Sequence, residues 1–418
     1  MQKEISYRLK RISVDLVEKG RSLLDPLAEL VAMEEVDKRS RGVVYTPREI
    51  LQQPQTWQRT YENVLQLSPG LQKFLDLAEL ETGSRNSLSV FLVGAGTSDY
   101  IGKSICALLQ KKWSCEVHAV PSTDLLTNLD DHLIPGRNYL WISFSRSGDS
   151  SEGVAVLNTA REHYPNVKHL IVTCNENGQM ARMFTDDKKF FRIVLDDEVN
   201  DRGLAMTSSF SNMVVVGQAL ANLADLPTYK VILGQLVTAA SDLLATAPTI
   251  CERLVAEGFS KTCFLGSGAL KGAATESALK VLELTDGRVT SFAESFLGLR
   301  HGPLSGIDEN TLLVSYFARD SRTRSFEMDV VKEICEKGLT NKCLAIFPGH
   351  PERISGFSEE NSIFLEVGDN VLDPYRPPLD VIVGQLLGLL ASLREGLLPD
   401  TPSPGGALSR VVTHVNIY

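Results

Sequence analysis

The chain has 418 residues, 43% of them hydrophobic, and a formal net charge of −10. This charge argues against a protein that binds nucleic acid or an anionic membrane, because both partners require a basic surface. The length exceeds what one hydrophobic core usually supports, so we expect two domains.

Short β-rich runs alternate with longer helical runs from residue 88 onward. In the first half we expect strands at residues 89–93, 116–120, 139–144 and 169–173, and a helix at residues 100–109. A long helical stretch at residues 223–256 follows, and we expect breaks in it near its two prolines. This alternation is typical of a parallel sheet with helices on both faces.

The same alternation resumes in the second half. Here we expect strands at residues 262–265, 311–317, 343–347 and 362–367, and helices at residues 272–285 and 326–337. The run VFLVGAG at residues 90–96 parallels CFLGSG at residues 263–268, which indicates a duplicated α/β domain. The expected organisation is a helical segment at 1–60, a first domain at 61–226, a second at 227–395, and a tail at 396–418.

A hydroxyl-rich loop at residues 143–152, SFSRSGDSSE, follows an expected strand and precedes an expected helix. Backbone N–H groups of such a turn, the helix dipole and serine hydroxyls form a cradle for a small anion, most commonly phosphate. The alternative is a solvated turn in which serine and glycine only shape the backbone.

The turn Gly94-Ala95-Gly96-Thr97-Ser98 is a second hydroxyl-bearing junction between a strand and a helix. Both turns face the same edge of a parallel sheet, so we expect four serines to converge on one phosphate: Ser98, Ser145, Ser147 and Ser150. The alternative for Thr97 and Ser98 is a plain helix cap. The spacing of glycines fits neither a P-loop nor a dinucleotide fingerprint, and we expect no cofactor.

In the second half, Glu276, Lys280 and Glu283 have the spacing of one helical face, for which a surface ion pair is the ordinary explanation. His301 precedes a Gly-Pro turn, so we expect its ring on a loop, free to reach a ligand. No histidine has a metal-ligand spacing, and we expect no metal. A carboxylate and a loop histidine suffice to move protons on a sugar.

These motifs together resemble the sugar isomerase (SIS) domain family, with two SIS domains as in the isomerase portion of glucosamine-6-phosphate synthase. The resemblance implies a three-layer, flavodoxin-like fold in each half. It extends over most of the chain, and its matching segments are residues 49–50, 53–54, 96–98, 145–150, 276–283, 301–304, 385–386 and 408–412.

The resemblance implies a role for each candidate side chain. The four serines named above hold the sugar phosphate, and Gly96, Thr97, Arg146 and Arg410 are further substrate-binding candidates. Glu283 matches the base that moves a proton between C1 and C2, and Lys280 matches a lysine of the same site. His301 matches the residue that opens the sugar ring, contributed in the synthase by a neighbouring subunit, which predicts at least a dimer.

Three departures from the synthase narrow the function. The first cysteine is Cys106, so an N-terminal glutaminase is not expected and glutamine is not the nitrogen donor. Arg410 stands where the synthase has an imine-forming lysine, and a guanidinium that never loses its proton cannot form an imine. Met206 replaces a small hydroxyl residue, which predicts different sugar contacts.

The sequence therefore predicts a stand-alone deaminase/isomerase, most similar to bacterial galactosamine-6-phosphate deaminases, formerly described as tagatose-6-phosphate ketose/aldose isomerases. It would convert galactosamine 6-phosphate to tagatose 6-phosphate and ammonia. The alternatives are an isomerase of a non-amino hexose phosphate, a sugar-amine deglycase, and a non-catalytic sugar-phosphate sensor.

The expected location is the cytoplasm. The seven cysteines include no Cys-x-x-Cys pair, which fits buried thiols in a reducing compartment. The first five residues do not resemble a signal peptide. The apolar stretch at residues 381–393 is too short to span a bilayer and predicts a buried helix.

Overall fold

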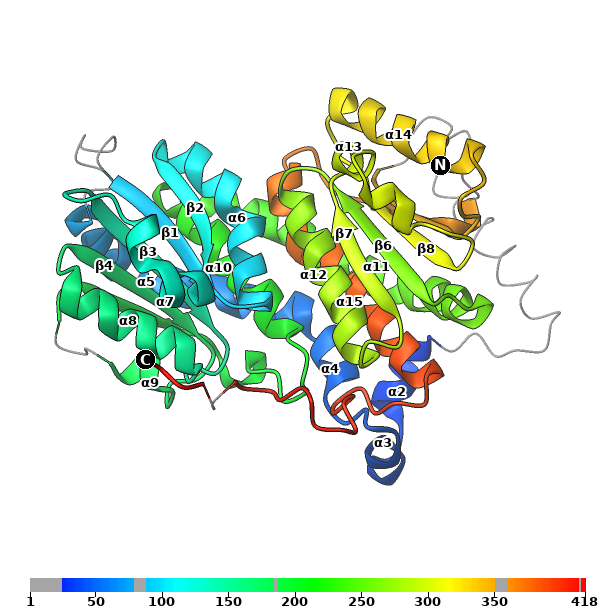
Figure 1. Cartoon of the computed structure of the whole chain (residues 1–418), viewed down its shortest axis with the longest axis horizontal. Coiled ribbons are helices and arrows are strands. Elements are labelled where there is room, and N and C mark those ends of the chain that lie inside the picture. The colour runs from blue at the N-terminus through cyan, green and yellow to red at the C-terminus, as the bar shows by residue number, and fades with distance from the viewer. Residues whose placement is uncertain (1–24, 79–87, 184–186, 350–358, 413–414) are drawn as a thin grey trace.

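The computed structural model describes residues 25–78, 88–183, 187–349, 359–412 and 415–418. The first 24 residues of the expected helical segment lie outside the described residues. The described part contains two five-stranded parallel sheets, one in each half of the chain, with helices on both faces (Figure 1). The predicted α/β fold with a duplicated domain is therefore confirmed.

The first sheet has the strand order β2-β1-β3-β4-β5. Its strands are β1 (Leu88–Gly94), β2 (Glu116–Pro121), β3 (Asn138–Ser145), β4 (Val167–Thr173) and β5 (Phe190–Val194). The four predicted strands are all present. The sequence analysis did not include β5, an edge strand that is mostly half-buried and therefore lacks a continuous apolar run.

The second sheet has the strand order β10-β9-β8-β6-β7. Its strands are β6 (Lys261–Gly266), β7 (Thr290–Glu294), β8 (Thr311–Tyr316), β9 (Cys343–Pro348) and β10 (Ser362–Leu365). Numbered within its own half, each sheet has the flavodoxin-like order 2-1-3-4-5, so the duplication extends to the topology. The edge strand β7 was also not predicted, for the same reason as β5.

Helices between the two sheets join the halves into one core. They are α6 (Thr97–Trp113), α10 (Ser208–Ala221), α12 (Ala269–Leu284) and α15 (Pro377–Arg394). One continuous apolar cluster includes residues of all four. The outer faces are covered by α7 (Ser122–His132), α8 (Ser151–His163), α9 (Gln179–Arg182), α13 (Phe296–Leu299) and α14 (Ser321–Glu336). Each half thus has three layers, and the inner layers pack on each other.

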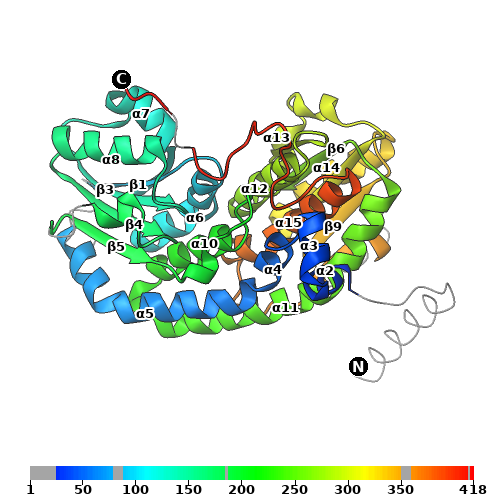
Figure 2. The same cartoon turned by 90° about the horizontal axis from the view of Figure 1, so that it is seen from below.

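Two long helices run together along one side of the molecule (Figure 2). They are α5 (Gln53–Leu77) and α11 (Leu226–Glu257). The expected boundary at residue 60 falls inside α5. The expected break at Pro248 is wrong, because α11 continues through it. A proline removes one backbone donor, and the buried face of α11, packed on α5 and α15, holds the rest of the helix in place.

The remaining described elements are short. They are α2 (Pro26–Ala32), α3 (Glu35–Arg41), α4 (Thr46–Leu51) and the 3₁₀ turns η2 (Asp197–Val199), η3 (Leu223–Asp225), η4 (Pro303–Gly306), η5 (Glu359–Asn361) and η6 (Asp373–Tyr375). Within the described ranges, one helix, at residues 223–257, is long and apolar enough to cross a membrane, and half of its apolar window is buried in the protein. The seven cysteines are free thiols; five are buried, as predicted, whereas Cys106 and Cys335 are half-buried.

The C-terminal tail leaves the second half after α15 and crosses to the first half (Figure 1). There the backbone carbonyl of Val412 accepts a hydrogen bond from the N–H of Ser151, the first residue of α8. On the way, the Asp400 carboxylate accepts backbone N–H groups of Val44, Tyr45 and Thr46. The tail therefore ties both halves to the segment that precedes α5.

Candidate active site

Both hydroxyl-rich turns lie at the carboxyl edge of the first sheet, where its strand order reverses between β1 and β3. Ligands of open α/β sheets bind in the crevice at this point. Gly96 has φ 55°, a left-handed conformation that favours glycine, and the residue that follows it opens α6. The backbone of the first turn is thus shaped to expose the start of α6 to the crevice.

A small cavity of about 60 Å³ occupies this crevice. Its hydroxyl-bearing lining residues are Ser98, Ser122, Ser143, Ser145 and Ser150. Three of these five were predicted to bind phosphate. The Ser143 hydroxyl is buried and has no hydrogen-bond partner among the described residues, which leaves it available to a ligand. The structure thus brings neutral donors together at a site where an anion would be well held.

The serine loop is pre-organised by its own hydroxyls. Ser145 Oγ accepts the N–H of Gly148 at 3.0 Å, and Ser147 Oγ accepts the N–H of Asp149 at 3.2 Å. Ser150 caps α8, since its Oγ accepts the Gly153 N–H at 3.3 Å. Ser150 therefore both caps α8 and lines the cavity. Of the four predicted serines, only Ser147 does not line the cavity.

Arg146 is buried beneath this loop and clamps three chain segments. Its guanidinium donates to the carbonyls of Gly203 at 3.4 Å, Leu204 at 3.0 Å and Arg410 at 2.5 Å. Burial, reinforced by the positive charge of Arg410, lowers the pKa of Arg146. The side chain thus connects the serine loop to the loop before α10 and to the tail.

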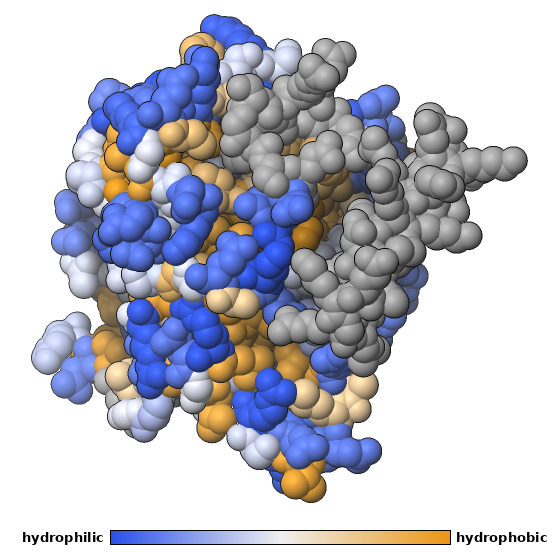
Figure 3. All heavy atoms as spheres, turned by 90° about the vertical axis from the view of Figure 1, so that its right-hand side faces the viewer, coloured by the Kyte–Doolittle hydropathy of each residue, from blue (hydrophilic) through white to orange (hydrophobic). Residues whose placement is uncertain are grey.

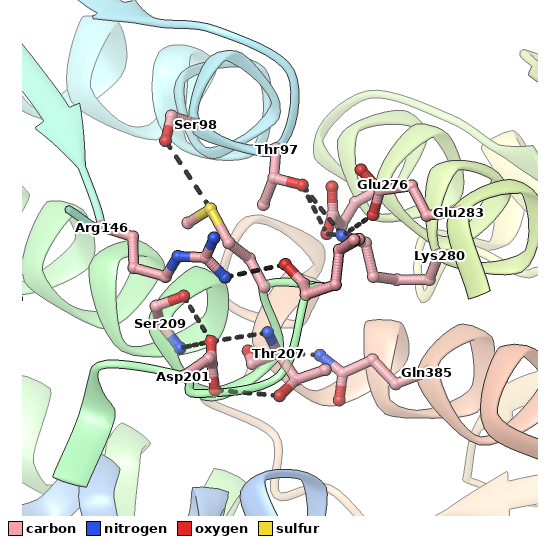
Figure 4. Close-up of polar contacts among 12 residues, drawn as sticks. Thr97, Ser98, Arg146, Asp201, Thr207, Ser209, Glu276, Lys280, Glu283 and Gln385 are labelled. Carbon is pink, nitrogen blue, oxygen red and sulfur yellow. Dashed lines mark hydrogen bonds and ion pairs between the residues drawn. The ribbon is translucent and has the colours of Figure 1, made fainter. Parts of the chain in front are cut away.

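Arg410 extends the same clamp. Its guanidinium donates to the backbone carbonyl of Asp201 at 2.8 Å and to Asn200 Oδ1 at 2.7 Å. The Asp201 carboxylate in turn accepts the backbone N–H groups of Thr207, Ser208 and Ser209 at the start of α10 (Figure 4). The structure therefore places both arginines on backbone and amide oxygens around residues 200–207.

The second part of the site is a buried cluster on α12. Lys280 Nζ lies 3.2 Å from Glu276 Oε1, 2.7 Å from Glu283 Oε2 and 3.0 Å from Thr97 Oγ1 of the first half. Lys280 and Glu276 are fully buried, and the Glu283 side chain is 23% exposed. The surface ion pair considered from the spacing is therefore wrong, because α6 packs on α12 and covers this face.

Two consecutive residues of α6 link the two parts of the site. Figure 4 shows Thr97 pointing toward Lys280 and Ser98 pointing away from it. Ser98 lines the serine cavity, where its Oγ also lies 4.0 Å from Met206 Sδ. Adjacent residues of α6 thus contact the serine cavity and the α12 cluster.

Burial and mutual attraction set the charges in the cluster. Burial raises the pKa of Glu276 to about 8, only partly opposed by the nearby charge of Lys280. Burial alone would lower the pKa of Lys280, but the charges of Glu276 and Glu283 outweigh it and raise this pKa. Lys280 therefore stays protonated near neutral pH, and a protonated amine is a poor nucleophile.

His301 lies away from this cluster in the same chain. It follows α13, its backbone N–H donates to the Gly298 carbonyl, and its side chain is exposed. Lys271, near the start of α12, is ion-paired with Glu294 at the end of β7, so α13 lies near the N-terminal end of α12. Glu283 is at the other end, roughly 18 Å along the helix axis at the α-helical rise.

The resemblance to the SIS family is borne out by comparison with known proteins. A family model described as SIS domain matches residues 85–223. The D-galactosamine-6-phosphate deaminase AgaS of Escherichia coli is 34% identical over 383 residues, which cover 90% of this chain and 95% of the relative. The chain belongs to the AgaS family. A second AgaS family protein, from Shewanella sp. (strain ANA-3), is 33% identical over 90% of this chain and 92% of its own length.

Solved structures of the AgaS family and its distant relatives have the same fold. The tagatose-6-phosphate ketose/aldose isomerase of Escherichia coli superimposes with a TM-score of 0.78 at 33% identity, covering 86% of this chain and 95% of that one. The C-terminal domain of glucosamine-fructose-6-phosphate aminotransferase from Francisella tularensis has a TM-score of 0.70 at 19% identity, covering 85% and 97%. This second likeness shows the fold alone.

The sequence analysis of this AgaS family member missed three side chains of the site. Ser122 follows β2 at the same edge as the two predicted turns, so a hydroxyl directly after a strand was the available signal. Ser143 interrupts the apolar run of β3 two residues before Ser145. Glu276 was noted for its spacing only, and its burial has no signal in the sequence.

Proposed function

We propose that the protein is a D-galactosamine-6-phosphate deaminase, which converts its substrate to tagatose 6-phosphate and ammonia. The observation that carries this proposal is the junction at Thr97 and Ser98, which connects a serine-lined cavity to the buried α12 cluster. Phosphate binding in the cavity would direct the sugar toward Glu283. The names of the AgaS relative and of the tagatose isomerase support the amino sugar and the ketose, respectively.

The proposed reaction starts from the open-chain sugar, in which C1 is an aldehyde and C2 carries the amine and one hydrogen. Glu283 removes the C2 proton while O1 takes up a proton from solvent, which gives an enaminol. Glu283 then returns its proton to C1, and the resulting iminium at C2 releases a proton to solvent to become an imine. Water adds to this imine, ammonia leaves, and the ketose phosphate remains. Proton transfer of this kind requires a carboxylate held near both carbons.

Lys280 has a positioning role in this proposal. Its ammonium fixes the Glu283 carboxylate at 2.7 Å and anchors the cluster to Thr97 of the first half. The raised pKa of Lys280 disfavours imine formation with the sugar, and Arg410 cannot form an imine. Glu283 therefore acts as a general base without covalent attachment of the substrate.

We propose that His301 opens the ring bound by a neighbouring subunit. Within one chain, about 18 Å of α12 separate the His301 region from Glu283, more than a histidine side chain can bridge. His301 is exposed, and so are nearby apolar side chains of the second half, Leu297 at 45% and Phe326 at 47%. Figure 3 shows apolar patches among polar residues on the outer face of this half. A homodimer that buries such residues would bring His301 to the second active site.

Mixing two inactive variants tests this arrangement. His301→Ala and Glu283→Gln should each be inactive alone, and unfolding and refolding them together should restore about one quarter of the wild-type activity, because mixed dimers have one complete site. The control is the same mixture without exchange of subunits. A mixture that stays inactive after exchange, with mixed dimers demonstrated by mass spectrometry, would show that His301 acts in its own chain.

Ammonia release tests the proposed function. The purified protein is assayed with galactosamine 6-phosphate, glucosamine 6-phosphate and galactose 6-phosphate, and both ammonia and ketose are measured. We expect equimolar ammonia and ketose from the galacto substrate, with lower kcat/KM for the gluco substrate. Ketose formation from a non-amino sugar would favour a simple isomerase, and binding of every sugar phosphate without turnover would favour a sensor.

We also propose that the protein acts in the cytoplasm. Loss of ammonia from the C2 imine is a hydrolysis, so the deaminase is formally also a hydrolase. The free, mostly buried thiols fit a reducing compartment.

In the parts of the chain that the structure describes, no group of three metal-ligating side chains is present.

A further inference from the structure

The second half of the chain repeats the backbone of the phosphate cradle. Gly96, before α6, has φ 55° and ψ −125°, and Gly268, before α12, has φ 57° and ψ −127°. Gly96 follows β1 and Gly268 follows β6, the first strand of each sheet in chain order, at the point where the strand order reverses. The duplicated half therefore retains the turn that, in the first half, opens a helix toward an anion.

The elements that complete the cradle are also duplicated. Ser143 of β3 pairs with Val93, the residue before Gly94 of the first turn. Ser315 of β8 pairs in the same way with Leu265, the residue before Gly266 of the second turn. The loop from β8 to α14, residues 317–320, is one residue shorter than the loop from β3 to α8, residues 146–150. When α8 and α14 are aligned at their first residues, Leu157, which lines the phosphate cavity, corresponds to Glu327. An acidic residue thus replaces an apolar one beside the second cradle.

The Glu327 carboxylate accepts a backbone donor of this second cradle. Its Oε2 accepts the Ala318 N–H of the loop after β8 at 2.7 Å, and the side chain is 1% exposed. Burial raises the pKa of Glu327, and hydrogen bonding from Ser267 and Ala318 partly lowers it again. Ser267 belongs to the Gly266–Gly268 turn, so the carboxylate contacts both loops of the cradle.

Two buried polar atoms in this region have no partner among the described residues. One is Glu327 Oε1 and the other is Ser315 Oγ. Ser315 faces the α14 side of the second sheet. Side chains two residues apart in a strand share a face, and Leu313 and Phe317 both belong to the apolar cluster that α14 covers. In the first half, Ser143 has the same position, lines the cavity and also lacks a partner.

We propose that the second half contains a duplicate anion site whose ligand is the protein's own Glu327 carboxylate, and that removing this carboxylate opens a second phosphate site. The donors available to phosphate are the Ala318 N–H and the hydroxyls of Ser267 and Ser315. The occupied second cradle leaves the wild-type chain with one phosphate site, in the first half.

Counting bound inorganic phosphate on the full-length protein tests this proposal. Equilibrium dialysis should give one phosphate per chain for the wild type and two for Glu327→Ala. Glu327→Gln is the matched control, because its amide fills the same space without charge, and it should bind one. The count requires no turnover, so it is independent of the proposed enzymatic activity.

The double variant Ser145→Ala, Glu327→Ala assigns the second phosphate, since it weakens the first site and should retain binding at the other. If Glu327→Ala does not fold alone, refolding in phosphate should recover more native protein than refolding in sodium chloride of equal ionic strength. Two phosphates on the wild type would overturn the proposal. So would a natively folded Glu327→Ala that binds one phosphate, or a refolding yield that phosphate does not improve.

Discussion

Glu283→Gln is expected to lower kcat for galactosamine 6-phosphate by about 10²–10⁴, the usual contribution of a general base. Glutamine keeps an oxygen that can accept the hydrogen bond from Lys280, so the fold and the phosphate cavity should remain intact. KM should change little, because the phosphate is held by the first half. Steady-state kinetics with coupled ammonia detection gives both parameters.

A matched control for Glu283→Gln is Glu336→Gln on α14, an exposed carboxylate that makes only a long ion pair with Lys332. This variant should keep wild-type kinetics. If Glu283→Gln kept near-normal turnover with every hexosamine phosphate, another group would have to remove the C2 proton. Glu276, with its raised pKa, would then be the next candidate.

Lys280→Met is expected to lower the free energy of unfolding by about 3–5 kcal/mol, the cost of removing one partner from a buried ion pair. The lysine is fully buried, and without it the Glu283 carboxylate loses its compensating charge, while Glu276, whose pKa burial raises to about 8, stays mostly protonated at neutral pH. Chemical denaturation followed by circular dichroism measures the loss. We also expect this variant to lose activity, since Glu283 loses the contact that positions it.

The exposed pair of Lys332 with Glu336 provides the control for Lys280→Met. Lys332→Met should change the free energy of unfolding by no more than about 1 kcal/mol, as for other surface ion pairs. Adding Glu276→Gln to Lys280→Met should recover part of the lost stability at alkaline pH, where Glu276 would otherwise have to carry a buried, unpaired charge. A Lys280→Met variant as stable as the wild type would show that the charge of Lys280 is not needed to stabilise the buried carboxyl groups of the cluster.

Local patterns were sufficient to predict most of the fold. The apolar runs of β1, β3 and β8 are continuous because these strands are covered on both faces, and this makes such strands visible in a sequence. The edge strands β5 and β7 escaped prediction because their residues are mostly half-buried, so neither has a continuous apolar run. The continuity of α11 through Pro248 depends on packing with α5 and α15, which propensity does not describe.

The site residues likewise fall into those that the sequence predicted and those that it did not. The loop at residues 145–150 and the turn at residues 94–98 were predicted because a strand, a turn and a helix start leave their mark within a few residues. The neighbouring Ser122 was not predicted, since its only signal is one hydroxyl directly after a strand. Its membership in the cavity follows from the alignment of three strand ends at one edge of the sheet.

The sequence by itself determined that this chain is a duplicated α/β protein, and it predicted an anion cradle in the first half and an acid–base pair in the second. Only the tertiary structure decided that Glu276 and Lys280 are buried rather than exposed, that both arginines bind backbone carbonyls, and that Glu327 fills the second cradle. The physical reason is that helical spacing places side chains on a face, whereas the charge and hydrogen bonding of that face depend on what a distant part of the chain packs against it.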